Sequence, residues 1–273
     1  MRATITFSLL LLAPVIASAQ PNTVTITTAC TDPGPPAEVA TPATPSMAAG
    51  TAAARNREFA VARANFRPLA EQGNVDAQRA MGQLLMQDCT GMQDKPAAVT
   101  WLTKAAGSGN VVAEILLGRA YLRGLGVTQD DGKAFALYSQ AAAAANPIAQ
   151  MEVGYLYNSG RGVPQDRYQG LQWSVKAAEQ GNAVALSNIA WAYITGDAVA
   201  RNVDRAAYFW ALADQRAILT ERPEIIGTGQ QIKLATSVEN MDRQAKRAKS
   251  WSPGPGSLKD VLAEADDFRR HHS

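Results

Sequence analysis

The chain of 273 residues has few of the side chains on which most catalytic and metal sites depend. Its only histidines, His271 and His272, lie at the very end, and it has two cysteines, Cys30 and Cys89. The body of the chain therefore lacks a Ser-His-Asp or Cys-His arrangement and the clustered Cys/His spacing of a zinc site. We expect no catalytic residue, no cofactor and no metal, so a binding function is favoured over an enzyme.

Excess charge and long apolar runs are also scarce. The net charge of +2 balances 26 basic and 24 acidic residues, which indicates no basic stripe for nucleic acid. The apolar run LLLLAPVIA near the start is too short to span a bilayer, and Ala19 before Gln20 fits the small-residue rule of signal peptidase. We predict a signal peptide over residues 1–19, no membrane span in the mature chain, and a periplasmic or secreted location.

The two cysteines would then meet an oxidising compartment, where an even count favours a disulfide between Cys30 and Cys89. Cys30 lies within residues 20–54, which are rich in threonine, alanine and proline and predict a disordered leader. Two unpaired thiols are therefore the alternative to a disulfide.

A period of 36 residues runs through the middle of the chain without insertion or deletion. Each copy carries two residues of the kind that cap helix N-termini, which are Asn74 and Asp94, Asn110 and Asp130, Asn146 and Asp166, and Asn182 and Asn202. The apolar residues that follow each cap have the i, i+3, i+4 spacing of a helix. The pattern predicts an all-α solenoid of four antiparallel helix pairs over residues 55–215, with a lone helix capping its start.

Two stretches, YLRGLGVTQD from Tyr121 and YNSGRGVPQD from Tyr157, contain a Gly-x-Gly that is common in phosphate-binding loops. In a phosphate loop the glycines follow a strand and open a helix. Here they follow one helix and precede another, which is typical of a helix C-cap and a tight reversal. Whether Arg161, at the tip of the second loop, contacts a partner is left open.

The stretch AQMEVGYLYNSGRGVPQDRYQGLQWSVKAAEQGN resembles the Sel-one-like repeat family, relatives of tetratricopeptide repeats. The usual unit of that family has Ala, Leu-Gly and Tyr on its first helix, a Gly-x-Gly-Val loop, and a second helix ending in alanines. The resemblance covers about residues 57–214 and implies a right-handed superhelix used for protein–protein interaction, often in exported bacterial proteins. The first loop, QDCTGMQD, and the fourth, TGDAVARN, depart from the pattern.

In such solenoids the first helix of each pair lines the concave face, so residues beside its core positions are candidates for binding. They are Ile115, Arg119, Arg123, Met151, Tyr155, Asn158, Ser187, Trp191 and Ile194. Arg119, Tyr155 and Trp191 stand 36 residues apart and should form a ladder of residue types common at interface hot spots. The alternative is that Tyr155 and Trp191 pack between repeats.

The C-terminal flank is expected to close the array. Residues 216–251 predict capping helices, and residues 252–273 predict a Pro/Gly break and a short amphipathic helix that docks in cis or on a partner. We expect a non-catalytic scaffold or adaptor that binds a protein or peptide. A module that binds cell-wall peptidoglycan or glycan and an uncharacterised hydrolase are the alternatives. The partner's identity and the oligomeric state stay open.

Overall fold

The computed structural model describes residues 39–87, 93–217 and 222–272. Over these residues the chain forms thirteen helices and no strand, so the all-α solenoid predicted from the 36-residue period is confirmed. The helices are α1 (Met47–Arg55), α2 (Phe59–Glu71), α3 (Val75–Met86), α4 (Lys95–Gly107), α5 (Val111–Arg123), α6 (Asp131–Ala143), α7 (Pro147–Ser159), α8 (Arg167–Ala178), α9 (Ala183–Thr195), α10 (Val203–Arg216), α11 (Arg222–Ala235), α12 (Val238–Ala248) and α13 (Lys259–His272).

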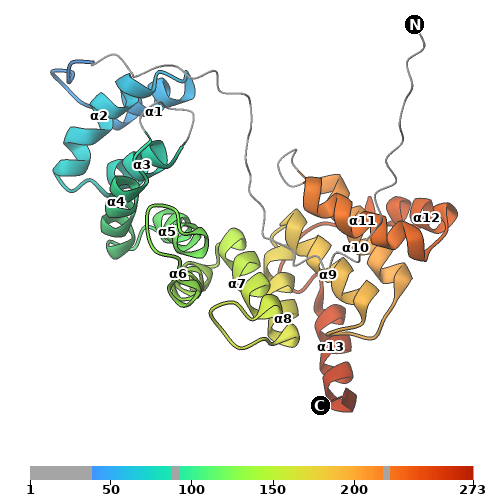
Figure 1. Cartoon of the computed structure of the whole chain (residues 1–273). Coiled ribbons are helices and arrows are strands. Elements are labelled where there is room, and N and C mark those ends of the chain that lie inside the picture. The colour runs from blue at the N-terminus through green and yellow to red at the C-terminus, as the bar shows by residue number, and fades with distance from the viewer. Residues whose placement is uncertain (1–38, 88–92, 218–221, 273) are drawn as a thin grey trace, which may run out of the picture.

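From α1 to α11 each helix contacts the next along the chain, and together they build a curved array (Figure 1). The four repeats are α3–α4, α5–α6, α7–α8 and α9–α10. The first helix of each pair lies toward the hollow of the curve, whereas α4, α6 and α8 lie along its outer side. The inner helices therefore offer the face on which side chains from several repeats come together.

The predicted caps begin the helices as expected. The side-chain oxygens of Asn74, Asn110, Asn146 and Asn182 each accept a hydrogen bond from the backbone N–H of the alanine three residues on. Those of Asp94, Asp130, Asp166 and Asn202 accept one from the backbone N–H of the third residue of the second helix, whatever its type. The glycine loops end the inner helices. Gly124, Gly160 and Gly196 are left-handed C-caps, so these loops are turns within a repeat.

Small residues let the two helices of a pair approach closely. A Cβ added to Gly154 on α7 would lie 2.9 Å from the carbonyl oxygen of Gly170 on α8. That distance is too short for a side chain, so glycine is required where the two backbones meet. The approach explains why the first helices of the first three repeats tolerate glycine, a residue of low helix propensity, where the fourth has Ala190.

The N-terminal end differs from the prediction in one respect. Residues 20–54 were expected to be a disordered leader, yet all of α1 except its last residue, Arg55, lies in that range, and the side chain of Ser46 caps its start. Gly50 of α1 packs against Phe66 of α2, and both belong with Ala53 and Ala62 to one buried region. The helix α2, which was expected to cap the array alone, therefore packs against α1. The alanine-rich segment α1 can do this because its small residues form one face that fits against a neighbouring helix.

The C-terminal end is closed by α11, α12 and α13. Helices α11 and α12 pack on α10, as expected of capping helices. The tail helix α13 docks in cis, with Leu258, Val261 and Ala265 buried in the largest apolar cluster of the molecule, which extends from α8 to α13. On its polar side the Tyr193 hydroxyl donates to Glu264 at 2.8 Å.

Several sequence-based predictions fall outside the described residues. They are the signal peptide over residues 1–19 with its cleavage site at Ala19 and Gln20, and the pairing of Cys30 with Cys89. Among the helices that are described, none combines the length and the apolar character that crossing a membrane requires.

Candidate functional site

The inner helices present side chains at equivalent heights in successive repeats. On α5, positions 112, 115, 119 and 123 are spaced by three or four residues and so share one face of the helix. The equivalent residues of α7 and α9 lie 36 and 72 positions further on. We call the face formed by these positions on α5, α7 and α9 the inner face.

Two of the residues predicted to bind a partner on this face are instead part of the core. Ile115 is 6% exposed and packs in the cluster around Tyr138, and Ser187 is 2% exposed and donates to the Thr228 hydroxyl on α11 at 2.9 Å. The side chain of Asn158 turns toward α8, the second helix of its repeat, where it lies against Gly170. These three assignments are corrected, because each of these side chains packs against a neighbouring helix rather than facing the hollow.

The other predicted residues, on this face or beside it, do reach the surface. Arg119, Arg123, Met151, Tyr155 and Ile194 are half-buried, and Trp191 is 45% exposed. Sequence reasoning missed the row nearest the helix N-termini, where Val112 and Ile148 are 42% and 45% exposed. Their signal was the 36-residue spacing of two aliphatic residues, seven positions before Arg119 and Tyr155.

Trp191 differs from the other tryptophans of the chain. A cation lies over each of the other four rings, at 4.5 Å for Lys104 on Trp101, 4.0 Å for Lys176 on Trp173, 5.5 Å for Lys233 on Trp210 and 4.5 Å for Arg216 on Trp251. No cation covers the Trp191 ring among the described residues. An aromatic ring that is half-exposed and uncovered is available to stack on a ligand.

A buried carboxyl lies beneath the arginines of the inner face. Glu152 on α7 is 8% exposed, and its Oε2 accepts no hydrogen bond from the described residues. Burial raises the pKa of this carboxyl, and the positive charges of Arg119 and Arg123 on α5 oppose that rise. The positive charges of the two arginines thus partly offset the cost of burying this acid at the junction of the second and third repeats.

A cavity of about 380 Å³ opens beside Trp191, between α9 and α11. It is lined by Trp191, Ile194 and Thr195 from α9, by Gln231, Leu234 and Ala235 from α11, and by Arg201 from the loop after α9. Of the predicted residues, the structure brings Trp191 and Ile194 together here. Gln231, Leu234 and Ala235 were missed, because α11 has no counterpart in the repeats and so no column to compare. Thr195 and Arg201 belong to the fourth repeat and were missed because their part in the cavity depends on α11 as its second wall.

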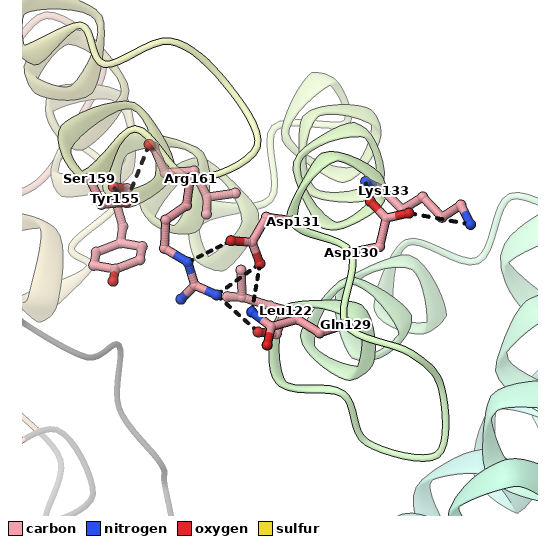
Figure 2. A network of polar contacts seen from close by, with 9 residues as sticks. Leu122, Gln129, Asp130, Asp131, Lys133, Tyr155, Ser159 and Arg161 are labelled. Atoms are coloured by element: carbon pink, nitrogen blue, oxygen red, sulfur yellow. Dashed lines mark hydrogen bonds and ion pairs between the residues drawn. The ribbon is translucent and has the colours of Figure 1, made fainter.

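Arg161, whose role the sequence left open, joins two repeats (Figure 2). Its guanidinium donates to both carboxylate oxygens of Asp131 at 2.9 and 2.8 Å and to the Leu122 carbonyl oxygen at 3.1 Å. The same guanidinium lowers the pKa of the Asp131 carboxyl through these hydrogen bonds. Arg161 therefore ties the loop of the third repeat to the second repeat.

The described residues contain no group of three or more His, Cys, Asp or Glu side chains that could hold a metal ion. The inner face thus combines exposed apolar side chains with arginines, and its chemistry is that of a contact surface.

The family model described as Sel1 repeat matches residues 75–110, 111–146, 147–182 and 183–213, which together make up more than half of the chain. The chain belongs to the Sel1 repeat family. The matched segments coincide with the four helix pairs, so each Sel1 repeat is one inner and one outer helix. Sel1 repeat arrays are scaffolds typical of protein–protein interaction and are generally non-catalytic.

Solved structures agree on the fold. A Sel1 repeat protein from Oxalobacter formigenes superposes with a TM-score of 0.59 at 22% identity, over 82% of this chain and 98% of that one. The protein c5321, a protective antigen of uropathogenic Escherichia coli strains with the same fold, gives a TM-score of 0.55 at 23% identity. That match covers 77% of this chain and 49% of c5321. No curated protein matches this sequence significantly.

Proposed function

We propose that this Sel1 repeat protein is a non-catalytic scaffold that binds a protein or peptide on its inner face, in the periplasm or outside the cell. The observation that carries the proposal is the exposure of Trp191 without a covering cation, in line with Tyr155 and Arg119 of the preceding repeats. Tryptophan, tyrosine and arginine are the residues most enriched among interface hot spots.

The location rests on the sequence rather than on the fold. Residues 1–19 have the short apolar run and small-residue end of a signal peptide. Cell fractionation of a tagged chain, together with the N-terminal sequence of the mature protein, tests it. A cytoplasmic, uncleaved product would contradict the proposed location.

Partner capture tests the inner face. The tagged protein is used to retrieve partners from a periplasmic extract of its own host, and the Tyr155→Ala, Trp191→Ala double variant is compared with Trp101→Ala. Trp101 is a matched control, because it lies on outer helix α4 under Lys104. We expect the double variant to lose most of the captured partner and the control to retain it. Equal capture by all three folded proteins would contradict the proposal.

Binding to cell-wall glycan is the second candidate, and the same uncovered Trp191 ring favours it, since an exposed indole also packs on the apolar face of a sugar. Sedimentation with purified peptidoglycan separates the two candidates. Pelleting that depends on Trp191 would favour the glycan, whereas protein that stays in the supernatant would favour a protein or peptide partner.

A further inference from the structure

The cavity between α9 and α11 has the features of a site for one end of a peptide. Its walls are two helical triads with the same spacing, Trp191, Ile194 and Thr195 on α9 and Gln231, Leu234 and Ala235 on α11. In each triad the residues are three and four positions apart and so lie on one face of their helix. The volume of about 380 Å³ is at the small end of ligand sites, which suits one or two residues rather than a folded surface.

Each wall of this open cavity presents one exposed apolar side chain, and we call the space between these two side chains the apolar slot. Leu234 is 85% exposed and Trp191 is 45% exposed, so both side chains have large areas to bury against a ligand. Leu234 follows the buried Ile232 by two positions and therefore lies on the other side of α11 from the core. An exposed leucine facing an uncovered indole is favourable for a large aliphatic or aromatic side chain placed between them.

Among the described residues that line the cavity, Arg201 is the only charged one. Its Nε–H donates to the carbonyl oxygen of Ile194 at 3.1 Å, which fixes the root of the guanidinium at the C-terminal end of α9. No carboxylate within the described ranges forms an ion pair with it. Its two Nη groups therefore keep their four N–H donors, in the geometry that binds a carboxylate through two parallel hydrogen bonds.

One polar side chain remains beside the slot. Gln231 has an exposed amide with no hydrogen bond to the described residues, and an amide can both donate to and accept from a peptide backbone. By contrast, the hydroxyl of Thr195 already donates to the Trp191 carbonyl oxygen at 3.0 Å. The lining thus supplies an apolar slot, a cation with free donors and one backbone-reading amide.

We propose that this cavity binds the C-terminal residue of a peptide partner, with its free carboxylate on Arg201 and a large apolar side chain between Trp191 and Leu234. The inference rests on the proposed function, because it names which part of the partner enters the inner face. A partner held only by an internal segment would leave the guanidinium of Arg201 without the anion that its position favours.

The test uses the mature protein with its tryptophan indoles ¹⁵N-labelled and the Trp191 resonance assigned from the Trp191→Phe variant. The probe is an octapeptide of serine and glycine that ends in leucine, as free acid and as C-terminal amide. We expect the acid to shift the Trp191 resonance saturably at millimolar concentration, with an affinity on the order of tenfold above that of the amide.

Two variants separate the contributions of the site. Arg201→Gln should bring the affinity for the acid down to that for the amide, whereas Arg243→Gln, an exposed arginine on α12, should leave the preference intact. Leu234→Ser should weaken the binding of acid and amide alike. Because Leu234 is 85% exposed, the variant should keep the wild-type fold, which a circular dichroism melt checks directly.

The outcomes that overturn the proposal are specific. They are equal affinity for acid and amide, no saturable shift, or a preference that survives Arg201→Gln. An octapeptide ending in D-alanine that binds as well as the leucine probe would overturn the apolar slot and point to a cell-wall stem peptide. If the octapeptides give any of these contradicting results while partner capture still depends on Tyr155 and Trp191, only the inference of a carboxylate site fails. If the carboxylate preference holds and capture does not depend on Tyr155, the proposed inner face fails instead.

Discussion

The junction between the second and third repeats and the junction between the third and fourth use the same positions with different residues. At the first of these, Arg161 in a loop pairs with Asp131 at the start of an outer helix. One repeat later the charges are exchanged, because Asp197 in the loop pairs with Arg167. The position after the loop residue also changes, from Gly162 to Ala198. We call these the second junction and the third junction.

The comparison extends to the inner helices. Glu152 at the second junction is a buried carboxyl near Arg119 and Arg123, whereas the equivalent residues of the next repeat are Asn188, Tyr155 and Ser159. An acid and two cations are thus replaced together by neutral side chains. The 36-residue period therefore preserves the shape of the junction. The charged residues at equivalent positions change from one repeat to the next, and a charged residue and its partner change together.

The largest effect is expected where the second junction has no room for a side chain. Gly162 has φ +71°, and an added Cβ would lie 2.1 Å from the backbone oxygen of Asp131. Gly162→Ala should lower the free energy of unfolding by about 3 kcal/mol, from the left-handed conformation and the backbone clash together. Urea unfolding followed by circular dichroism measures it.

The reverse change at the third junction is the control. Ala198 is 5% exposed and is not among the residues with positive φ, so Ala198→Gly should cost no more than about 1 kcal/mol. Equal costs at the two positions would mean that the loops approach the preceding helix in the same way, contrary to the structure.

The next effect comes from the ion pairs. In the second junction the side chains of Arg161 and Asp131 are 25% and 27% exposed, and Arg161→Ala should cost about 1–2 kcal/mol of stability. In the third junction the side chains of Arg167 and Asp197 are 47% and 35% exposed, so Arg167→Ala should cost about 0.5 kcal/mol or less.

The pH dependence of the Arg161→Ala effect provides a second readout. Because Arg161 lowers the pKa of Asp131 in the folded state, the stabilisation is present above the unfolded pKa and is lost as the pH falls through the folded pKa. The difference between wild type and variant should therefore be constant near pH 7 and shrink below about pH 4. If the difference in stability between wild type and variant persisted in acid, it would be assigned to the hydrogen bond between Arg161 and the Leu122 carbonyl oxygen instead.

A smaller effect, a gain in the free energy of unfolding, is expected when Glu152 is made neutral. Burial raises its folded pKa, so the unfolded chain ionises first and stability falls as the pH rises from the unfolded toward the folded pKa. Glu152→Gln, which makes this site neutral as in the next repeat, should stabilise the protein by on the order of 1 kcal/mol at pH 7 and by little at pH 4. A loss at pH 7 would show that pairing with Arg119 and Arg123 outweighs burial.

The last effect concerns the turns that join the repeats. Ala145 leads into the third repeat with φ +59°, whereas Gly181 leads into the fourth with φ +84°. Ala145→Gly should raise the free energy of unfolding by up to about 1 kcal/mol, and Gly181→Ala should lower it by a similar amount. Thermal melts of the two variants check the opposite signs, and two shifts of the same sign would contradict the strain assigned to Ala145.

The repeats could be predicted because each structural requirement recurs at a fixed interval. Asn146 and Asp166 cap helices for the same reason as their counterparts, so one copy explains the rest. The helix α1 was missed because its alanine-rich composition also suits a disordered segment, and its signals were the cap at Ser46 and the small residue at Gly50.

The candidate site was harder to predict, because burial within a helix face depends on neighbours outside the repeat. Ser187 has the same register as Met151, yet it is buried by Thr228 of α11, which no repeat contains. Arg201 and Leu234 line the cavity only because α11 folds back on α9. A period reveals which residues are equivalent, but not what lies opposite the last copy.

The docking of α13 sets where the array can change its length. Its carboxylates reach Tyr168 of the third repeat and both Tyr193 and Arg205 of the fourth, so one helix braces two neighbouring repeats. A gene duplication that adds a copy before the third repeat would leave every one of these contacts intact. A copy inserted between the third and fourth would carry Tyr168 away from Asp266, so this protein can grow by duplication from its N-terminal half while its C-terminal half stays a fixed end.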